Sequence, residues 1–93
     1  MRIQVTLYTR RDCRLCEEMK SVVRTVSQSY PVDLAELDID QDRDLHAQFD
    51  QEVPVLFIEG RKAFKYRVTE TALRTRLEQV LLRKESITTS PSG

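Results

Sequence analysis

Apolar and polar side chains alternate along residues 3–8, so that every second position is apolar. This period of two predicts a strand with one buried face. From Leu15 to Val26 the apolar positions recur every three or four residues, which is the stripe of an amphipathic helix. The dipeptide Tyr30-Pro31 predicts the end of this helix, because the residue before a proline is disfavoured in helical geometry.

The middle of the chain predicts a second strand, a short helix and a third strand. Residues 32–39 alternate imperfectly and favour a strand, whereas residues 40–50 begin with acidic residues, as helix starts often do. Residues 53–58 form the most apolar stretch of the chain and predict a buried strand. We expect this strand to begin at Pro54, since a strand tolerates proline at its first position but not in its middle.

A hairpin and a last helix complete the predicted fold. Residues 59–61 carry turn chemistry and lead into a weaker, more polar strand over residues 62–66, which we expect at an edge. Thr69 is the candidate N-cap of the last helix. The apolar stripe of that helix consists of Ala72, Leu73, Leu77, Val80 and Leu81. After Lys84 the chain becomes polar, and residues 85–93 are expected to form a disordered tail.

The predicted order β-α-β-α-β-β-α indicates a single α/β domain over residues 1–84. The first two strands are joined by a helix, so they should run parallel with a right-handed connection. The hairpin then completes a four-stranded mixed sheet. We expect the first and third helices on one face of the sheet and the second helix on the other.

The charge composition argues against several classes of function. Fifteen basic and fifteen acidic residues cancel, which is unlike the basic footprint of a nucleic-acid-binding domain. No apolar run approaches the roughly 18–20 residues of a membrane span, and the N-terminus lacks the pattern of a secretory signal. We therefore expect a cytoplasmic monomer that binds neither nucleic acid nor membrane.

The only two cysteines of the chain, Cys13 and Cys16, lie between the first strand and the first helix. In a reducing compartment a lone C-x-x-C pair is more often catalytic or metal-binding than a structural disulfide. The start of a helix brings the two sulfurs within bonding reach, and its unpaired N–H groups favour a thiolate. This placement predicts a redox-active dithiol.

Two other interpretations of the cysteines remain open at this stage. The thiols could be inert, or they could bind a metal together with His46. A structural zinc site needs four ligands, so the metal interpretation requires a dimer that pools two C-x-x-C pairs. Otherwise we assign no role to His46 and expect it on the exposed side of its helix.

The cations beside the dithiol are candidates for substrate binding. Arg10 and Arg14 flank the cysteines, although the nearby acids formally cancel their charge. The pKa of Cys13 is therefore expected in the upper half of the range of about 3.5–7.5 known for such motifs. A weaker interpretation is that Lys65 or Arg67 attracts an acidic group of the substrate.

Four motifs in this order carry a resemblance to a known family. They are Leu7-Tyr8-Thr9, Cys13-x-x-Cys16, Val53-Pro54 at the start of an apolar strand, and Gly60 in a hairpin. The chain thus resembles the glutaredoxin branch of the thioredoxin superfamily over residues 2–84, and the small bacterial glutaredoxin-like proteins in particular.

The resemblance implies a thioredoxin-like fold and a division of roles in the site. Cys13 would be the attacking nucleophile and Cys16 the resolving thiol. Pro54 would be a cis proline that faces the dithiol, and the backbone of Val53 would hold an extended substrate. Relatives that bind glutathione carry a Gly-Gly pair after the last strand, whereas residues 63–68 of this chain contain no glycine.

These observations favour a thiol–disulfide oxidoreductase that works through a mixed disulfide with a protein or a small molecule. No bound cofactor is expected, and glutathione is a candidate reductant. Two alternatives remain open: a non-catalytic binding module whose dithiol senses redox state, and a dimer bridged by a metal or cluster.

Overall fold

The computed structural model describes residues 2–89 and contains the predicted succession of strands and helices. The elements are β1 (Ile3–Thr9), α1 (Arg14–Ser27), β2 (Val32–Asp38), the short 3-10 turn η1 (Ile39–Gln41), α2 (Arg43–Phe49), β3 (Val55–Ile58), β4 (Arg61–Lys65) and α3 (Glu70–Thr89). The four strands form one sheet in the order β2-β1-β3-β4. β1 pairs in parallel with β2 and antiparallel with β3, and β4 pairs antiparallel with β3, so the predicted mixed sheet is confirmed.

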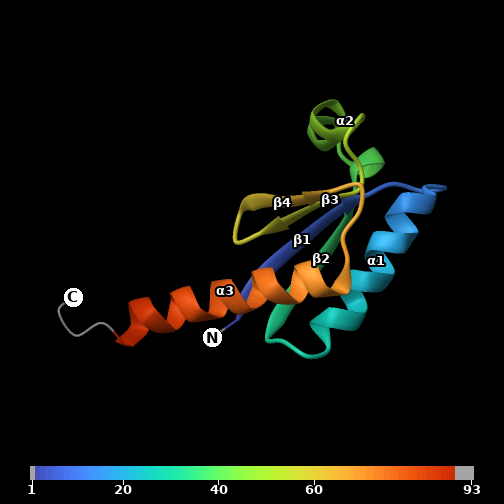
Figure 1. Cartoon of the computed structure of the whole chain (residues 1–93). Coiled ribbons are helices and arrows are strands. Elements are labelled where there is room, and N and C mark those ends of the chain that lie inside the picture. Colours follow the sequence, from blue (N-terminus) through green and yellow to red (C-terminus); the bar gives the residue numbers. More distant parts are fainter. Residues whose placement is uncertain (1, 90–93) are drawn as a thin grey trace.

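Helices cover both faces of this sheet, as predicted (Figure 1). The larger core cluster joins buried side chains of α1 and α3, such as Val23 and Leu77, to one face of the strands. A smaller cluster on the other face joins Phe49 of α2 to Val55 of β3 and to Tyr8, whose ring stacks on Phe49 at 4.6 Å between centroids. The fold is therefore an α/β fold with three layers.

The second helical segment is interrupted, which the sequence did not predict. Asp42 has an extended backbone (φ −142°, ψ 121°), and its carboxylate accepts hydrogen bonds from the N–H groups of Asp44 and Leu45. Asp42 is thus the N-cap of α2, and an N-cap residue lies outside helical geometry. The predicted helix over residues 40–50 is therefore a 3-10 turn followed by a separate two-turn helix.

Several other element ends differ by a few residues from the prediction. α1 ends at Ser27, before Tyr30, and β3 begins at Val55, one residue after Pro54. β4 ends at Lys65 because the next residue, Tyr66, has φ 71° and leaves strand geometry.

The last helix begins as predicted and continues beyond its predicted end. The hydroxyl of Thr69 accepts a hydrogen bond from the N–H of Ala72 at 3.0 Å, which confirms Thr69 as the N-cap. Helix α3 runs past Lys84 to Thr89, so the expectation of a disordered tail from residue 85 is wrong for residues 85–89. No glycine or proline interrupts this segment, and serine and threonine lower helix propensity only weakly. The rest of the predicted tail, residues 90–93, lies outside the described residues.

Within residues 2–89, none of the helices combines the length and the apolar character that a membrane crossing requires.

Candidate active site

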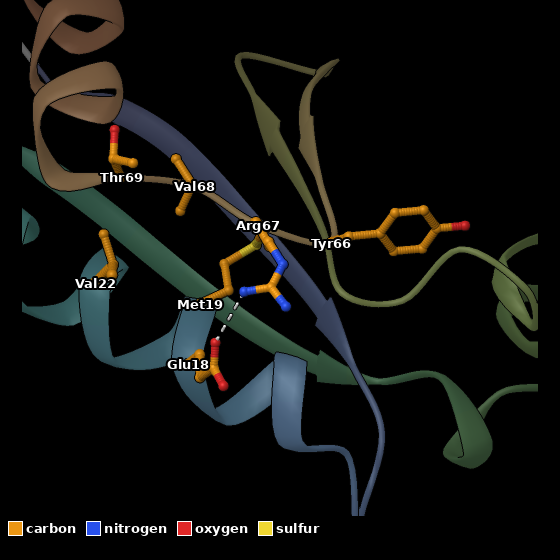
Figure 2. A pocket seen from close by; sticks show the side chains of 7 residues that line it. All are labelled: Glu18, Met19, Val22, Tyr66, Arg67, Val68 and Thr69. Carbon is orange, nitrogen blue, oxygen red and sulfur yellow. Dashed lines mark ion pairs between the residues drawn. The ribbon is translucent and has the colours of Figure 1, made fainter.

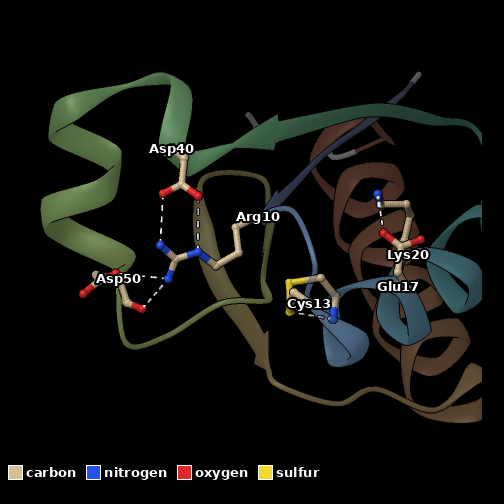
Figure 3. Close-up of a disulfide and its surroundings, with 7 residues drawn as sticks. Arg10, Cys13, Glu17, Lys20, Asp40 and Asp50 are labelled. Carbon is tan, nitrogen blue, oxygen red and sulfur yellow. Dashed lines mark hydrogen bonds and ion pairs between the residues drawn. A yellow bond between two sulfur atoms is a disulfide. The ribbon is translucent and has the colours of Figure 1, made fainter.

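The two cysteines lie at the start of α1 and are joined by a disulfide (Figure 3). Their Cα atoms are 5.1 Å apart. Asp12 has φ 52°, a left-handed conformation that aspartate tolerates better than most residues, and it turns the chain from β1 into the helix. Cys13 follows as the N-cap of α1, and its Sγ accepts a hydrogen bond from the N–H of Cys16 at 3.1 Å. The sulfur of Cys13 therefore occupies the place of a capping oxygen at the positive end of the helix.

The two sulfurs differ in their access to solvent. Cys13 is half-buried, whereas Cys16 is completely buried on the apolar stripe that also carries Met19 and Val23. A substrate that approaches from solvent can therefore reach Cys13 but not Cys16.

Two of the acidic residues beside the dithiol have cationic partners. Glu17 pairs with Lys20 on the same helix at 3.1 Å, and Glu18 pairs with Arg67 at 3.6 Å. Arg14 is exposed and forms no ion pair with the part of the chain that the structure describes. Arg14 is therefore still available to a substrate.

Arg10 is held by two carboxylates (Figure 3). Its Nη2 lies 3.0 Å from Asp40 Oδ1, and its Nη1 donates to Asp50 Oδ1 at 3.0 Å and to the carbonyl oxygen of Asp50 at 3.2 Å. The hydrogen bond from Arg10 lowers the pKa of the Asp50 carboxyl, and the neighbouring His46, 3.3 Å away, acts in the same direction. Arg10 thus fixes η1 and α2 beside the segment that leads to Cys13. The role of Arg10 in substrate binding stays a prediction. The geometry does not favour this role, because two carboxylates already hold the guanidinium group.

The peptide bond between Val53 and Pro54 is cis, as the resemblance implied. Pro54 is fully buried, and Val53 is half-buried. The next residue, Val55, lies opposite Tyr8 in the β1–β3 register. The cis peptide therefore lies at the end of β1 from which the chain continues to Cys13.

Tyr66 is a residue of this region that the sequence reasoning missed. Its hydroxyl donates to the carbonyl oxygen of Gln51 at 2.8 Å, and its backbone N–H donates to the carbonyl oxygen of Pro54 at 2.7 Å. The N–H of Arg67 donates to the carbonyl oxygen of Lys65 at 2.8 Å. Two backbone N–H groups of residues 63–68, the segment in which glutathione-binding relatives carry the Gly-Gly pair, are thus already bonded within the chain. Nothing in the spacing of residues could have revealed the positive φ of Tyr66.

A small cavity of about 200 Å³ lies between α1 and the connection from β4 to α3 (Figure 2). It is lined by Glu18, Met19, Val22, Tyr66, Arg67, Val68 and Thr69. Glu18 and Arg67 point toward each other from opposite sides, whereas the ring of Tyr66 points away from them (Figure 2). The cavity begins on the turn of α1 that follows Cys16.

Within residues 2–89 of a single chain, no group of three or more histidine, cysteine, aspartate and glutamate side chains could hold a metal ion, and the alternative of a metal shared by two chains stays a prediction. His46 lies against Asp50 and Asp40 instead.

Comparison of the sequence with known proteins finds a matching family and a curated relative. The glutaredoxin-like domain (DUF836) matches residues 4–78. The relative is described as glutaredoxin-like protein YDR286C homolog from Dictyostelium discoideum. It is 31% identical over 85 residues, and the match covers 85% of this chain and 79% of the relative.

Comparison of the structure finds similar folds among solved proteins. The X-ray structure of the protein XcR50 from X. campestris has a TM-score of 0.67 at 28% identity and covers 81% of this chain and 96% of its own. Protein Ne2328 from Nitrosomonas europaea has a TM-score of 0.67 at 27% identity, with coverages of 81% and 91%. Oxidised mitochondrial thioredoxin 3 from Saccharomyces cerevisiae, at 19% identity and a TM-score of 0.64, covers 83% of this chain and 77% of its own. The last similarity identifies the fold as thioredoxin-like.

Proposed function

We propose that this chain, which belongs to the family of glutaredoxin-like domains, is a thiol–disulfide oxidoreductase that uses Cys13 and Cys16. One observation carries the proposal. A half-buried cysteine caps the first helix with its sulfur, and that sulfur is bonded to the sulfur of a fully buried cysteine. A purely structural disulfide does not require that its two cysteines differ in exposure, whereas a redox couple needs one accessible sulfur and one protected sulfur.

The reaction would begin with the reduced dithiol. Cys13 loses its proton to solvent, and the N–H of Cys16 together with the start of α1 stabilises the resulting thiolate. The thiolate attacks one sulfur of a substrate disulfide, so that a mixed disulfide forms and the other substrate sulfur leaves as a thiolate.

Cys16 would complete the exchange. Its sulfur gives up a proton and attacks Cys13, which displaces the second substrate thiolate and closes the Cys13–Cys16 bond. Two electrons pass from the protein to the substrate, which is reduced to two thiols. The oxidised product of this cycle is the disulfide form described above. A dithiol reductant or two molecules of glutathione would then return the pair to its reduced state.

The substrate would bind beside the cis peptide. We assign the backbone of Val53, next to the buried Pro54, to hold an extended segment, and the exposed Arg14 to contact it. A polypeptide disulfide is favoured over glutathione, since the backbone N–H groups of Tyr66 and Arg67 are bonded within the chain. We propose a reducing setting such as the cytoplasm, where the dithiol form would be maintained.

Trapping the mixed disulfide tests this mechanism. In Cys16→Ser the resolving thiol is absent, so incubation with a disulfide substrate should leave a covalent adduct on Cys13 that mass spectrometry detects. Cys13→Ser is the matched control and should form no adduct, because the remaining thiol is buried. The mechanism fails when Cys16→Ser forms no adduct at any pH from about 6 to about 9, a range that brackets ionisation of ordinary and activated thiols.

A further inference from the structure

The ion pair between Glu18 and Arg67 lies at the cavity beside the dithiol and is weak. The nearest atoms, Oε1 and Nη1, are 3.6 Å apart, and the two side chains are 54% and 76% exposed. Ion pairs of this kind contribute little to stability, since water competes for both charges. A carboxylate of a bound ligand could therefore replace Glu18 as the ion-pair partner of Arg67 with little loss of free energy.

The charges around this pair favour an acidic ligand. Arg14 precedes Glu18 by four residues, so the two lie on the same side of α1. Glu18 thus has Arg14 about one turn before it on α1 and Arg67 as its ion-pair partner, and a second carboxylate would balance the two positive charges. Among the described residues that line the cavity, Glu18 is the only acidic one.

We propose that the cavity receives an acidic side chain of a polypeptide disulfide substrate, and that this side chain replaces Glu18 as the partner of Arg67. The inference rests on the proposed function, because it concerns the substrate of the same dithiol. At about 200 Å³ the cavity is smaller than the roughly 300–1,000 Å³ of pockets that enclose small molecules. A cavity of this size suits one side chain of a longer segment.

The position of the acidic residue in the substrate follows from the geometry of α1. Glu18 lies five residues after Cys13, which corresponds to about 7.5 Å along a helix. An extended peptide advances about 3.3 Å per residue. The acidic residue should therefore be about two residues away from the substrate cysteine.

Reduction of matched peptide disulfides tests the proposal. The substrates are symmetric disulfides of one peptide that carries Glu, Gln or Lys two residues from its cysteine, and kcat/KM is measured for each at low salt. The wild-type protein should prefer the Glu peptide over the Gln peptide by about three- to fivefold, the size expected of one exposed ion pair. Arg67→Gln should abolish this preference, and Glu18→Gln should increase it. Arg61→Gln, which removes a charge at the start of β4, the end of that strand away from Arg67, is the control and should retain the preference. Equal rates for the three peptides, or a preference that Arg67→Gln leaves intact, would overturn the proposal.

A binding experiment separates this proposal from the proposed reaction. The same peptides with serine in place of cysteine are titrated into the oxidised protein, and the amide resonances of residues 67–69 are followed by NMR. Tighter binding of the Glu peptide than of the Gln peptide supports the inference even when no peptide disulfide is reduced, a result that would sink the proposed function alone. Equal affinities overturn it. The proposal is also overturned when oxidised glutathione shifts the same resonances and Arg67→Gln removes these shifts, because the occupant of the cavity would then be glutathione.

Discussion

Tyr66 donates its backbone N–H to the carbonyl oxygen of Pro54 at 2.7 Å, so the residue that follows β4 is bonded to the proline of the cis peptide. The hydroxyl of the same residue reaches the carbonyl oxygen of Gln51 at 2.8 Å. Tyr66 thus contacts the segment before β3 through both its backbone and its side chain. This segment is the one that we assign to substrate binding.

Removal of the Tyr66 hydroxyl should affect both stability and exchange. Tyr66→Phe keeps the backbone bond to Pro54 and loses the bond to Gln51, which should lower the free energy of unfolding by about 0.5–1 kcal/mol. The less constrained segment should also slow exchange with a fixed disulfide substrate. Urea unfolding measures the first effect and stopped-flow kinetics the second.

Tyr30→Phe is the matched control for this change. It removes a hydroxyl that is bonded to Glu78 of α3 at 2.7 Å from the turn between α1 and β2, and it leaves the segment before β3 untouched. We expect Tyr30→Phe to exchange at the wild-type rate. Equal exchange rates for the two variants would show that Tyr66 has no influence on the site.

The contacts of Arg10 should make stability depend on pH. Arg10 lowers the pKa of Asp50 in the folded protein, below its ordinary value of 3.8. The stabilisation is therefore complete above that value and is lost as the pH falls through the lower, folded pKa. Arg10→Gln should be less stable than the wild type at neutral pH, and the difference should shrink under acidic conditions.

Urea unfolding at neutral and strongly acidic pH measures this difference. Arg61→Gln serves as the control, since Arg61 pairs with no carboxylate in the described part of the chain, and it should match the wild type under both conditions. A stability gap for Arg10→Gln that is as large in acid as at neutral pH would exclude the Asp50 carboxylate as its source.

Periodicity predicted the sheet and the helices because it reports which side of an element is buried. The alternation in β1 places Ile3, Val5 and Leu7 in the core, and the stripe of α3 places Leu73 and Leu77 there. The position of the cysteines followed from the same local patterns, since a helix start after a strand is a local feature.

The partners of Arg10 could not be predicted from the sequence. Asp40 and Asp50 are 30 and 40 residues away from it, and their meeting depends on how η1 and α2 return to β1. The pair of Glu18 and Arg67 has the same origin. Local spacing carries no information about such contacts, so the surroundings of the dithiol had to come from the fold.

Two leucines on α3 should respond very differently to truncation. Leu73 is 1% exposed and lies in the larger core cluster, whereas Leu82 is 65% exposed. Leu73→Ala should lower the free energy of unfolding by about 2–5 kcal/mol, because it leaves a cavity in the core. Leu82→Ala should have an effect within about 0.5 kcal/mol. Urea unfolding compares the two, and a similar loss in both variants would contradict the packing of α3.

The reduced Cys13 should ionise at lower pH than a free cysteine. In Cys16→Ser the backbone N–H that donates to Cys13 Sγ is retained, so the thiolate keeps its stabilisation at the start of α1. The rate of alkylation by iodoacetamide should therefore reach half its maximum at a lower pH than for a free thiol, whose pKa is about 8.5. Cys13→Ser is the matched control, and its single thiol should react slowly at every pH because Cys16 is fully buried. Half-maximal alkylation of Cys13 near pH 8.5, or faster alkylation of Cys16, would show that the helix start does not activate the exposed sulfur.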